Sequence, residues 1–188
     1  MKGYNKKYLF TKEEEYMITN NGLIIRTLEE KDLKLVKKWN NQQARGDYQE
    51  FNFQSLYNIK KEFEKDGFNS DKFKMLLIEI KDLNPLGLVY INFVRNGLAR
   101  IGIVLCEKSI RGQGFGSKAT DMVTKYIFNN FPIERIEANT DIENLPAQRV
   151  LLKSHFKKEG VLRHFRYHHG EWRDFVIYSI LREERLNN

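Results

Sequence analysis

The chain has 188 residues, of which 41% are hydrophobic and 30% are charged, so it carries enough apolar side chains for one sizeable core. With 3 prolines, 12 glycines and no run of about 18 apolar residues, the composition excludes collagen-like, disordered and membrane-spanning proteins. The 32 Lys and Arg residues outnumber the 25 Asp and Glu residues, which gives a net charge of +7 at pH 7. These cations are scattered, and no RNA-recognition, KH or helix-turn-helix motif accompanies them. We therefore expect neither a nucleic-acid partner nor a membrane partner.

Cysteine usage and the start of the chain indicate the compartment. Cys106 is the single cysteine, which excludes an intrachain disulfide and a cysteine-based zinc site. Residues 1–16 lack the apolar stretch of a secretory signal. We therefore expect a cytoplasmic protein without a bound metal.

Apolar periodicity in the first part of the chain predicts a hairpin and two helices. The Asn-Gly step at Asn21 and Gly22 is typical of a tight hairpin turn, and Ser55 has the composition of a helix N-cap. The predicted elements are strands at 16–19 and 23–28 and helices at 29–40 and 56–66. Between the two helices, residues 42–54 combine aromatic rings with carboxylates and show no period, so we expect a loop that lines a binding cleft.

The second part of the chain begins with extended segments joined by short turns, which predicts an antiparallel meander. Strands and helices then alternate up to a closing hairpin. The predicted elements are strands at 73–80, 86–94, 99–106, 133–140, 156–167 and 171–181 and helices at 118–130 and 147–154. The order of these elements predicts a single-domain, mixed α/β (α+β) fold.

The segment with the clearest chemistry is the glycine-rich turn at 111–117, between a predicted strand and a predicted helix. Glycines let backbone N–H groups approach an anion, and a helix N-terminus adds partial positive charge, so the turn suits a phosphate group. A P-loop requires Gly-Lys-Ser/Thr, whereas the order here is Gly116, Ser117, Lys118. A dinucleotide fingerprint requires a third glycine where Ser117 stands. Neither motif therefore describes this turn.

The motif that fits is Arg-x-x-Gly-x-Gly, formed by Arg111, Gly114 and Gly116. This segment resembles the acetyl-CoA-binding signature of the GNAT superfamily of N-acetyltransferases. The strand at 101–105 and the Asn-x-x-Ala sequence that begins at Asn144 resemble further family elements in the right order. The C-terminal part is similar to the branch that contains ribosomal-protein-alanine and diamine N-acetyltransferases.

The resemblance implies a mixed central sheet with an antiparallel meander, splayed fourth and fifth strands, and helices on both faces. It divides the chain into an N-terminal arm at 1–20, which has room for a short strand, and an N-acetyltransferase domain at 21–185. It is also compatible with a homodimer.

Acetyl-CoA is the donor that the resemblance implies, without a metal. Backbone amides of the glycine-rich turn are expected to hold its diphosphate, and the end of the fourth strand its pantetheine arm. A backbone amide at Leu105 is expected to polarise the thioester carbonyl. The expected cofactor-binding residues are Leu105, Cys106, Arg111, Gly112, Gln113, Gly114, Phe115, Gly116, Ser117, Asn144 and Arg149.

Acyl transfer to an amine requires removal of a proton from the amine and protonation of the departing thiolate. The tyrosine that many family members use as the acid is replaced here by Leu151, and a carboxylate on the fourth strand is replaced by Arg100. Thr140 and Asp141 are expected to hold a catalytic water, so we assign catalytic roles to them and to Leu105.

The acceptor amine is expected where the loop at 42–54 approaches the splayed strands. We assign Glu50 to attract a cation and Trp39 and Tyr48 to enclose it. The predicted function is acetyl-CoA-dependent N-acetylation of a primary amine: a protein N-terminus, a polyamine or another small cationic amine. The alternative is a catalytically weak CoA-binding sensor or scaffold with the same fold.

Overall fold

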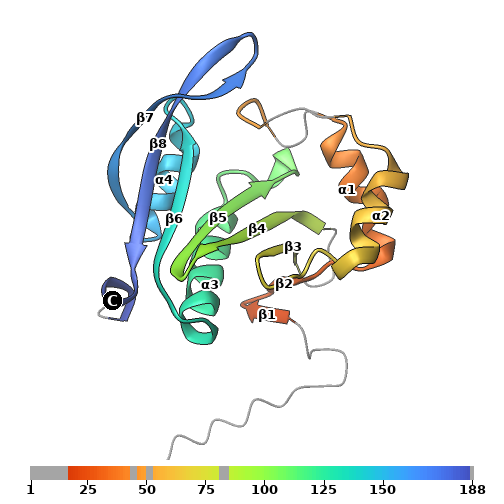
Figure 1. Ribbon diagram of the computed structural model, residues 1–188, viewed down its shortest axis with the longest axis horizontal. Helices are drawn as coiled ribbons and strands as arrows, with labels where there is room; N and C mark the ends of the chain where they lie inside the picture. Colours follow the sequence, from red (N-terminus) through yellow and green to blue (C-terminus); the bar gives the residue numbers. More distant parts are fainter. Residues whose placement is uncertain (1–16, 43–45, 50–52, 81–84, 187–188) are drawn as a thin grey trace, which may run out of the picture.

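The computed structural model describes residues 17–42, 46–49, 53–80 and 85–186, and within them the chain forms an eight-stranded mixed sheet (Figure 1). The strand order is β1-β2-β3-β4-β5-β6-β8-β7. The elements are β1 (Met17–Asn20), β2 (Leu23–Thr27), α1 (Leu33–Asn40), α2 (Leu56–Asp66), β3 (Phe73–Ile80), β4 (Pro85–Arg95), β5 (Gly97–Leu105), α3 (Phe115–Asn130), β6 (Ile133–Asp141), α4 (Leu145–Lys153), β7 (Lys157–His168), β8 (Glu171–Leu181) and α5 (Arg182–Leu186).

Local signals fix several element boundaries where the sequence predicts them. Asn21 and Gly22 both have positive φ, 44° and 80°, and form the two-residue turn that joins β1 to β2. The Ser55 hydroxyl accepts a hydrogen bond from the Asn58 N–H at 3.1 Å, and Gly67 ends α2 with φ 63°. Of the predicted arm, residues 17–20 form the short strand β1, and residues 1–16 lie outside the described part.

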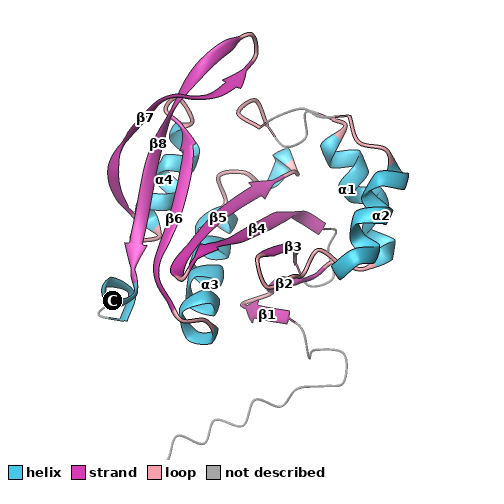
Figure 2. Cartoon of the chain, viewed as in Figure 1, coloured by secondary structure: helices cyan, strands magenta, loops and turns pink. Residues whose placement is uncertain are grey.

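Helices cover both faces of the sheet (Figure 2), so alternate residues of the central strands enter different cores. Leu76 and Ile78 of β3 pack in the larger core, with α3 and α4. Their neighbours Met75 and Leu77 pack in the smaller core, with α1 and α2. The predicted mixed α/β fold is confirmed. None of the helices in the described ranges is long and apolar enough to cross a lipid bilayer.

Helix α3 begins at Phe115, three residues before the predicted start. Gly114 takes φ 85° and is the N-cap residue, so the helix begins immediately after it. Glycine has a low helix propensity, which conceals a helix start inside a glycine-rich segment. The motif therefore supplies the first turn of α3 itself.

Strands β5 and β6 are parallel neighbours over only part of their length. Their pairing runs from Gly97 with Ile133 to Arg100 with Glu137. Beyond this point β5 stays paired with β4 as far as Leu105, while β6 follows β8. The two halves of the sheet thus separate in the middle, as the resemblance predicts for the fourth and fifth strands.

Gly87 permits the close approach of β4 to the end of β5. A Cβ atom there would lie 2.0 Å from the Val104 carbonyl oxygen, whereas a Cβ at Gly102 of the same strand pair would meet nothing nearer than the Tyr90 ring at 3.9 Å. Gly87→Ala should therefore lower the free energy of unfolding by about 3 kcal/mol, because the backbone must move. The matched variant Gly102→Ala should stay within about 1 kcal/mol of wild type in urea unfolding. Equal effects of the two variants would contradict the close approach.

Candidate functional site

The N-terminus of α3 has the features of an anion site. Its N-cap Gly114 makes no side-chain capping bond, and no acidic residue stands in the first turn. The Lys118 N–H donates to the Gly114 carbonyl at 3.1 Å, which is the first bond of the helix ladder. The preceding N–H groups, at 115–117, therefore point out of the helix end, where the helix dipole adds partial positive charge.

Two kinds of glycine shape this turn. Gly112 and Gly114 have φ values of 79° and 85°, and an added Cβ would meet nothing within 4 Å, so glycine serves the backbone conformation and leaves open space. At Gly116 a Cβ would lie 3.3 Å from Val150 Cγ2 and 3.8 Å from Leu105 Cδ1. Gly116 thus lets the start of α3 pack between α4 and the end of β5.

Side chains of the glycine-rich turn and its neighbours tie it to the rest of the fold. Gln113 Nε2 donates to the Ser109 carbonyl oxygen at 2.9 Å, which joins the turn to the preceding segment. Phe115, the first residue of α3, packs partly buried against the larger core. Ser117 takes part in the contact that joins α3 to the end of α4, because its carbonyl oxygen accepts a hydrogen bond from Ser154 Oγ at 3.3 Å. These contacts hold the glycine-rich turn against the preceding segment, the larger core and the end of α4.

The end of β5 presents Leu105, but not Cys106, to the gap between β5 and β6. The Cys106 N–H donates to the Leu86 carbonyl oxygen at 2.8 Å, and the Cys106 side chain is 3% exposed in the smaller core. Because hydrogen-bonding directions alternate along a strand, the Leu105 backbone then faces away from β4. The prediction that the Cys106 backbone meets the cofactor is corrected, since β4 already holds its N–H.

Arg111 connects the end of β5 with the loop at 46–49. Its Nη2 atom donates to the Leu105 carbonyl oxygen at 3.1 Å. The same guanidinium lies beside Gly46, where a Cβ would be 3.5 Å from Nη2. Arg111 therefore stands between the predicted donor and acceptor sides of the site.

Helix α4 brings the predicted Asn144 and Arg149 to the same region. Asn144 Oδ1 accepts the Ala147 N–H at 3.3 Å and caps α4. Arg149 is exposed, next to the Val150 that packs on the start of α3. Leu151, at the family's tyrosine position, is 7% exposed and belongs to the larger core. It offers no proton.

The Asp141 side chain is 3% exposed, and neighbouring residues of the protein already occupy its carboxylate with hydrogen bonds. Its carboxylate accepts hydrogen bonds from Arg173 Nε at 2.9 Å and Nη2 at 3.0 Å, and from the Glu143 N–H at 2.8 Å. Burial raises the pKa of Asp141, but the bonds from Arg173 and Glu143 outweigh it and leave the pKa below its ordinary 3.8. Thr140 is 7% exposed and pairs with Val176 of β8. The depressed pKa makes Asp141 a weak proton acceptor.

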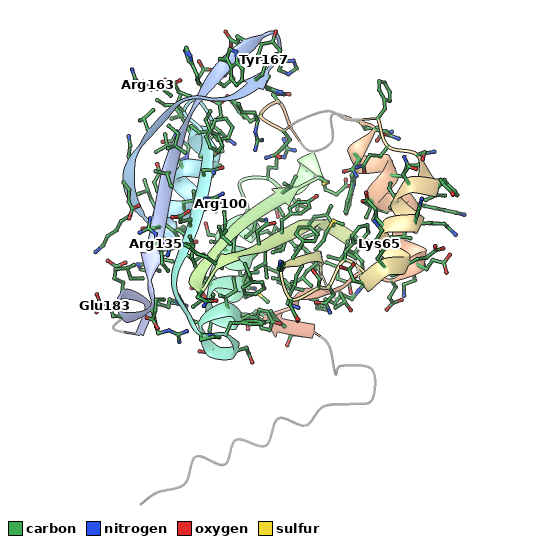
Figure 3. The ribbon with its side chains drawn as sticks, in the orientation of Figure 1. Lys65, Arg100, Arg135, Arg163, Tyr167 and Glu183 are labelled. Carbon is green, nitrogen blue, oxygen red and sulfur yellow. The ribbon has the colours of Figure 1, made fainter. Side chains whose placement is uncertain are left out.

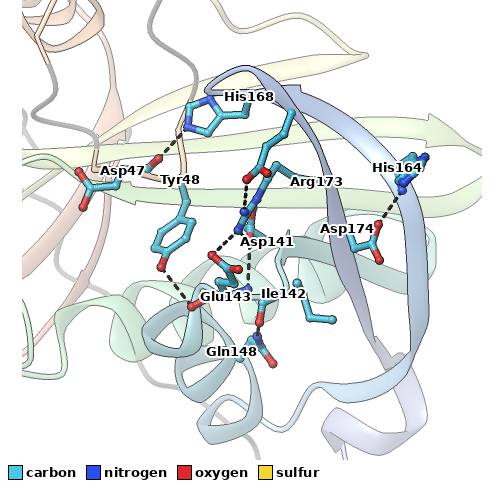
Figure 4. A network of polar contacts seen from close by, with 11 residues as sticks. Asp47, Tyr48, Asp141, Ile142, Glu143, Gln148, His164, His168, Arg173 and Asp174 are labelled. Atoms are coloured by element: carbon cyan, nitrogen blue, oxygen red, sulfur yellow. Dashed lines mark hydrogen bonds and ion pairs between the residues drawn. The ribbon is translucent and has the colours of Figure 1, made fainter.

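The described part of the predicted acceptor loop, residues 46–49, reaches across to the turn between β6 and α4 and to the β7–β8 hairpin (Figure 4). The Tyr48 hydroxyl donates to the Glu143 carbonyl oxygen at 3.2 Å. His168 Nε2 lies 2.7 Å from the Asp47 carbonyl oxygen. The predicted approach of this loop to the splayed strands is therefore present for residues 46–49.

The other two predicted acceptor residues have different outcomes. Trp39 is 1% exposed and packs with Leu33 and Val36 in the smaller core, so the prediction that it encloses a substrate is wrong. Its position in the apolar stripe of α1 explains this burial. Glu50 lies outside the described residues.

Charged side chains hold the base of the gap, where Figure 3 labels Arg100 and Arg135. Arg100 Nη2 lies 2.9 Å from Glu137 Oε2, and Arg135 Nε lies 3.1 Å from Glu137 Oε1. Burial raises the pKa of Glu137, but the bonds from the two arginines outweigh it and leave the pKa below its ordinary 4.5. Arg100, which replaces the family's strand carboxylate, thus ties β5 to β6 where their pairing ends.

Comparison with known proteins identifies the family. Residues 22–157 match the acetyltransferase (GNAT) domain. The chain belongs to the GNAT family. Like the proteins of that family, it is an acyltransferase.

Curated relatives of this GNAT chain carry the same broad description. It is 31% identical over 117 residues to the uncharacterized N-acetyltransferase p20 of Bacillus licheniformis, a match that covers 61% of this chain and spans 64% of p20. It is 27% identical over 173 residues to the uncharacterized N-acetyltransferase YnaD of Bacillus subtilis, covering 89% of this chain and 98% of YnaD.

Solved structures share the fold. The spermidine N-acetyltransferase of Vibrio cholerae, in complex with CoA and spermine, has a TM-score of 0.80 at 23% identity, covering 89% of this chain and 100% of that one. RimL, a ribosomal L7/L12 α-N-protein acetyltransferase in complex with CoA, has a TM-score of 0.76 at 19% identity, covering 89% and 99%.

The Asp141–Arg173 ion pair predicts how stability depends on pH. Because the folded state holds the pKa of Asp141 below 3.8, the pair stabilises the fold above pH 3.8, and its contribution is lost as the pH falls through the lower folded-state value. Asp141→Asn should lower the free energy of unfolding by about 2 kcal/mol at neutral pH. On acidification, the free energy of unfolding of this variant should then fall less than that of wild type. Urea unfolding at a series of pH values measures both effects.

The matched control is Asp71→Asn, at an exposed position. It should retain the wild-type pH profile. An Asp141→Asn profile parallel to wild type would contradict a stabilising ion pair in solution.

Proposed function

We propose that this chain is an acetyl-CoA-dependent N-acetyltransferase that transfers an acetyl group directly to a primary amine carrying positive charge. The observation that carries the proposal is the uncapped N-terminus of α3, which opens beside the gap between β5 and β6. A diphosphate suits the first feature and an extended arm suits the second.

The residues at the site fit acetyl-CoA, whose thioester supplies the acetyl group. The N–H groups at 115–117 are available to a diphosphate, and the open space at Gly112 and Gly114 admits it without steric conflict. Arg149 adds a cation on the adjacent helix. The Leu105 backbone faces away from β4, and its carbonyl oxygen accepts from Arg111. In this proposal the Leu105 N–H bonds the extended arm and polarises a carbonyl.

The charge at the acceptor side favours a cationic amine. The carboxylates of Asp141, Glu143 and Glu171 surround the Arg173 guanidinium, so negative charge is in excess at this cluster. The side chains of Glu143 and Glu171 are 64% and 61% exposed and face solvent. Since the whole chain is basic, this local excess stands out. A polyamine, a protein N-terminus or another small cationic amine fits it.

Proton transfer is assigned to water. Asp141 is held by Arg173 with a depressed pKa, and Leu151 is apolar, so neither matches the work of a base or an acid at neutral pH. Water entering the gap would take the amine proton and return one to the thiolate. Free amines are mostly protonated at neutral pH, with pKa values of about 8 for an α-amine and about 10.4 for an alkyl amine.

This assignment predicts a pH dependence set by the substrate. Below the pKa of the acceptor amine, kcat/KM should rise about tenfold per pH unit, because only the neutral amine reacts. A series of amines of different pKa should show plateaus that move with the amine. A plateau at one fixed pH for every amine would instead reveal an enzyme group acting as the base.

A substitution tests the diphosphate site. Gly114→Glu places a carboxylate at the uncapped helix end and should weaken acetyl-CoA binding by about 100-fold in calorimetry, through like-charge repulsion. Gly97→Glu is the matched control, because Gly97 also has positive φ, at 76°, and open space, but lies at the turn between β4 and β5. Both variants should lose similar stability, and only Gly114→Glu should lose affinity. Equal affinities would contradict the placement.

The second candidate function is a CoA-binding sensor or scaffold, which the apolar Leu151 at the family's acid position favours. A thiol-release assay with acetyl-CoA and a panel of amines separates the two. Turnover of a polyamine or of a peptide with a free N-terminus supports the enzyme. Tight acetyl-CoA binding without turnover of any amine supports the sensor.

A further inference from the structure

Arg173 of β8 joins several elements around the acceptor side of the site (Figure 4). Its Nε and Nη2 atoms bond the Asp141 carboxylate at the end of β6. Nη2 also lies 2.5 Å from Glu143 Oε2 in the turn before α4, and Nη1 lies 2.5 Å from Glu171 Oε1 at the start of β8. The Arg173 side chain is 17% exposed. One planar cation thus fixes two strand ends and a turn.

The turn at 141–144 owes its shape to these contacts. Asp141 Oδ1, which Arg173 orients, accepts the Glu143 N–H at 2.8 Å. The next residue of the turn, Ile142, donates its N–H to the Asp174 carbonyl oxygen at 3.0 Å. The Ile142 carbonyl oxygen accepts a hydrogen bond from Gln148 Nε2 at 2.7 Å. The Glu143 carbonyl oxygen is therefore held in one place, and this is the atom to which Tyr48 donates.

The second contact of the acceptor loop leads to the same arginine. His168 Nε2 lies 2.7 Å from the Asp47 carbonyl oxygen. His168 is the cross-strand partner of Glu171 at the tip of the β7–β8 hairpin. Because Arg173 bonds Glu171, it supports the contact between His168 and Asp47. Through Glu143 it also supports the contact made by Tyr48.

We propose that Arg173 is a positioning residue that sets where the acceptor loop at 46–49 sits over the gap between β5 and β6. It acts through Glu143 on Tyr48 and through the hairpin tip on Asp47, and it makes no bond to the substrate itself. The inference rests on the proposed function, since it assigns the loop to the acceptor amine. The start of α3 and the end of β5, which form the donor side, lie outside its contacts.

The kinetic test uses Arg173→Gln, with Arg26→Gln as the matched control. Arg26 also bonds two carboxylates, Asp32 and Glu79, but it stands on β2, on the other side of the sheet from β8. Arg173→Gln should raise the acceptor KM about tenfold and leave the dissociation constant of acetyl-CoA within about twofold. Arg26→Gln should change neither constant by more than about twofold. A parallel loss of donor and acceptor affinity in Arg173→Gln would overturn the proposal.

A double-mutant cycle tests the route through Tyr48. Tyr48→Phe removes the hydroxyl that bonds the Glu143 carbonyl and should raise the acceptor KM about threefold. The double variant should be no worse than Arg173→Gln alone, because the loop has already lost its support. Multiplication of the two effects would show independent roles and overturn the route. Arg173→Lys, which keeps the charge, should lie between wild type and Arg173→Gln and serves if the glutamine variant does not fold.

A measurement without turnover separates this proposal from the proposed function. Hydrogen exchange followed by mass spectrometry should show faster exchange at 46–49 in Arg173→Gln and unchanged exchange there in Arg26→Gln. If wild type acetylates no amine but this exchange pattern holds, the proposed function fails while the positioning role stands. Unchanged exchange at 46–49 in Arg173→Gln would overturn the positioning role.

Discussion

The end of pairing between β5 and β6 is the constraint on which the site depends. Arg100 and Glu137 form the last cross-strand pair, and the ion pair between their side chains closes the base of the gap. Past it, each strand takes its hydrogen bonds from a different neighbour, so neither can turn back without breaking a ladder. The strand end at Leu105 keeps backbone groups directed into the gap, and Gly116 lets the start of α3 pack against that end.

The predicted donor and acceptor sides of the site use different kinds of chemical group. On the donor side the groups that would bind are backbone N–H and C=O groups. They are accessible because Gly112 and Gly114 carry no side chain and have open space where a Cβ would be. On the acceptor side they are side chains, oriented by ion pairs among Asp141, Glu143 and Arg173. Under the proposed function, a short local motif therefore serves the diphosphate donor, whereas the acceptor side depends on contacts between distant parts of the chain.

This difference explains what sequence could predict. The hairpin turn at Asn21, the Ser55 cap and the glycine-rich turn are properties of a few adjacent residues, and all three are where the sequence places them. The direction of the Cys106 N–H is not predictable in this way, because it depends on strand register, which one strand alone does not reveal. The burial of Trp39 is not predictable either, because an aromatic residue on an amphipathic helix faces the core as readily as a cleft.

Tertiary contacts account for what the sequence did not reveal. Arg173 bonds a residue 32 positions away, and Tyr48 bonds one 95 positions away, so no local spacing signals either contact. The nearest available clue to Arg173 was its place in the C-terminal segment that resembles the family. Its partner Asp141 was visible as a carboxylate beside the site, but its engagement required the position of β8.

A crystal structure with bound CoA tests the central claim most directly. The account predicts diphosphate oxygens within hydrogen-bonding distance of the N–H groups at 115–117, and a pantetheine arm between β5 and β6 beyond Arg100, bonded to the Leu105 backbone. A diphosphate bound elsewhere, with the start of α3 untouched and the gap filled by side chains, would contradict it.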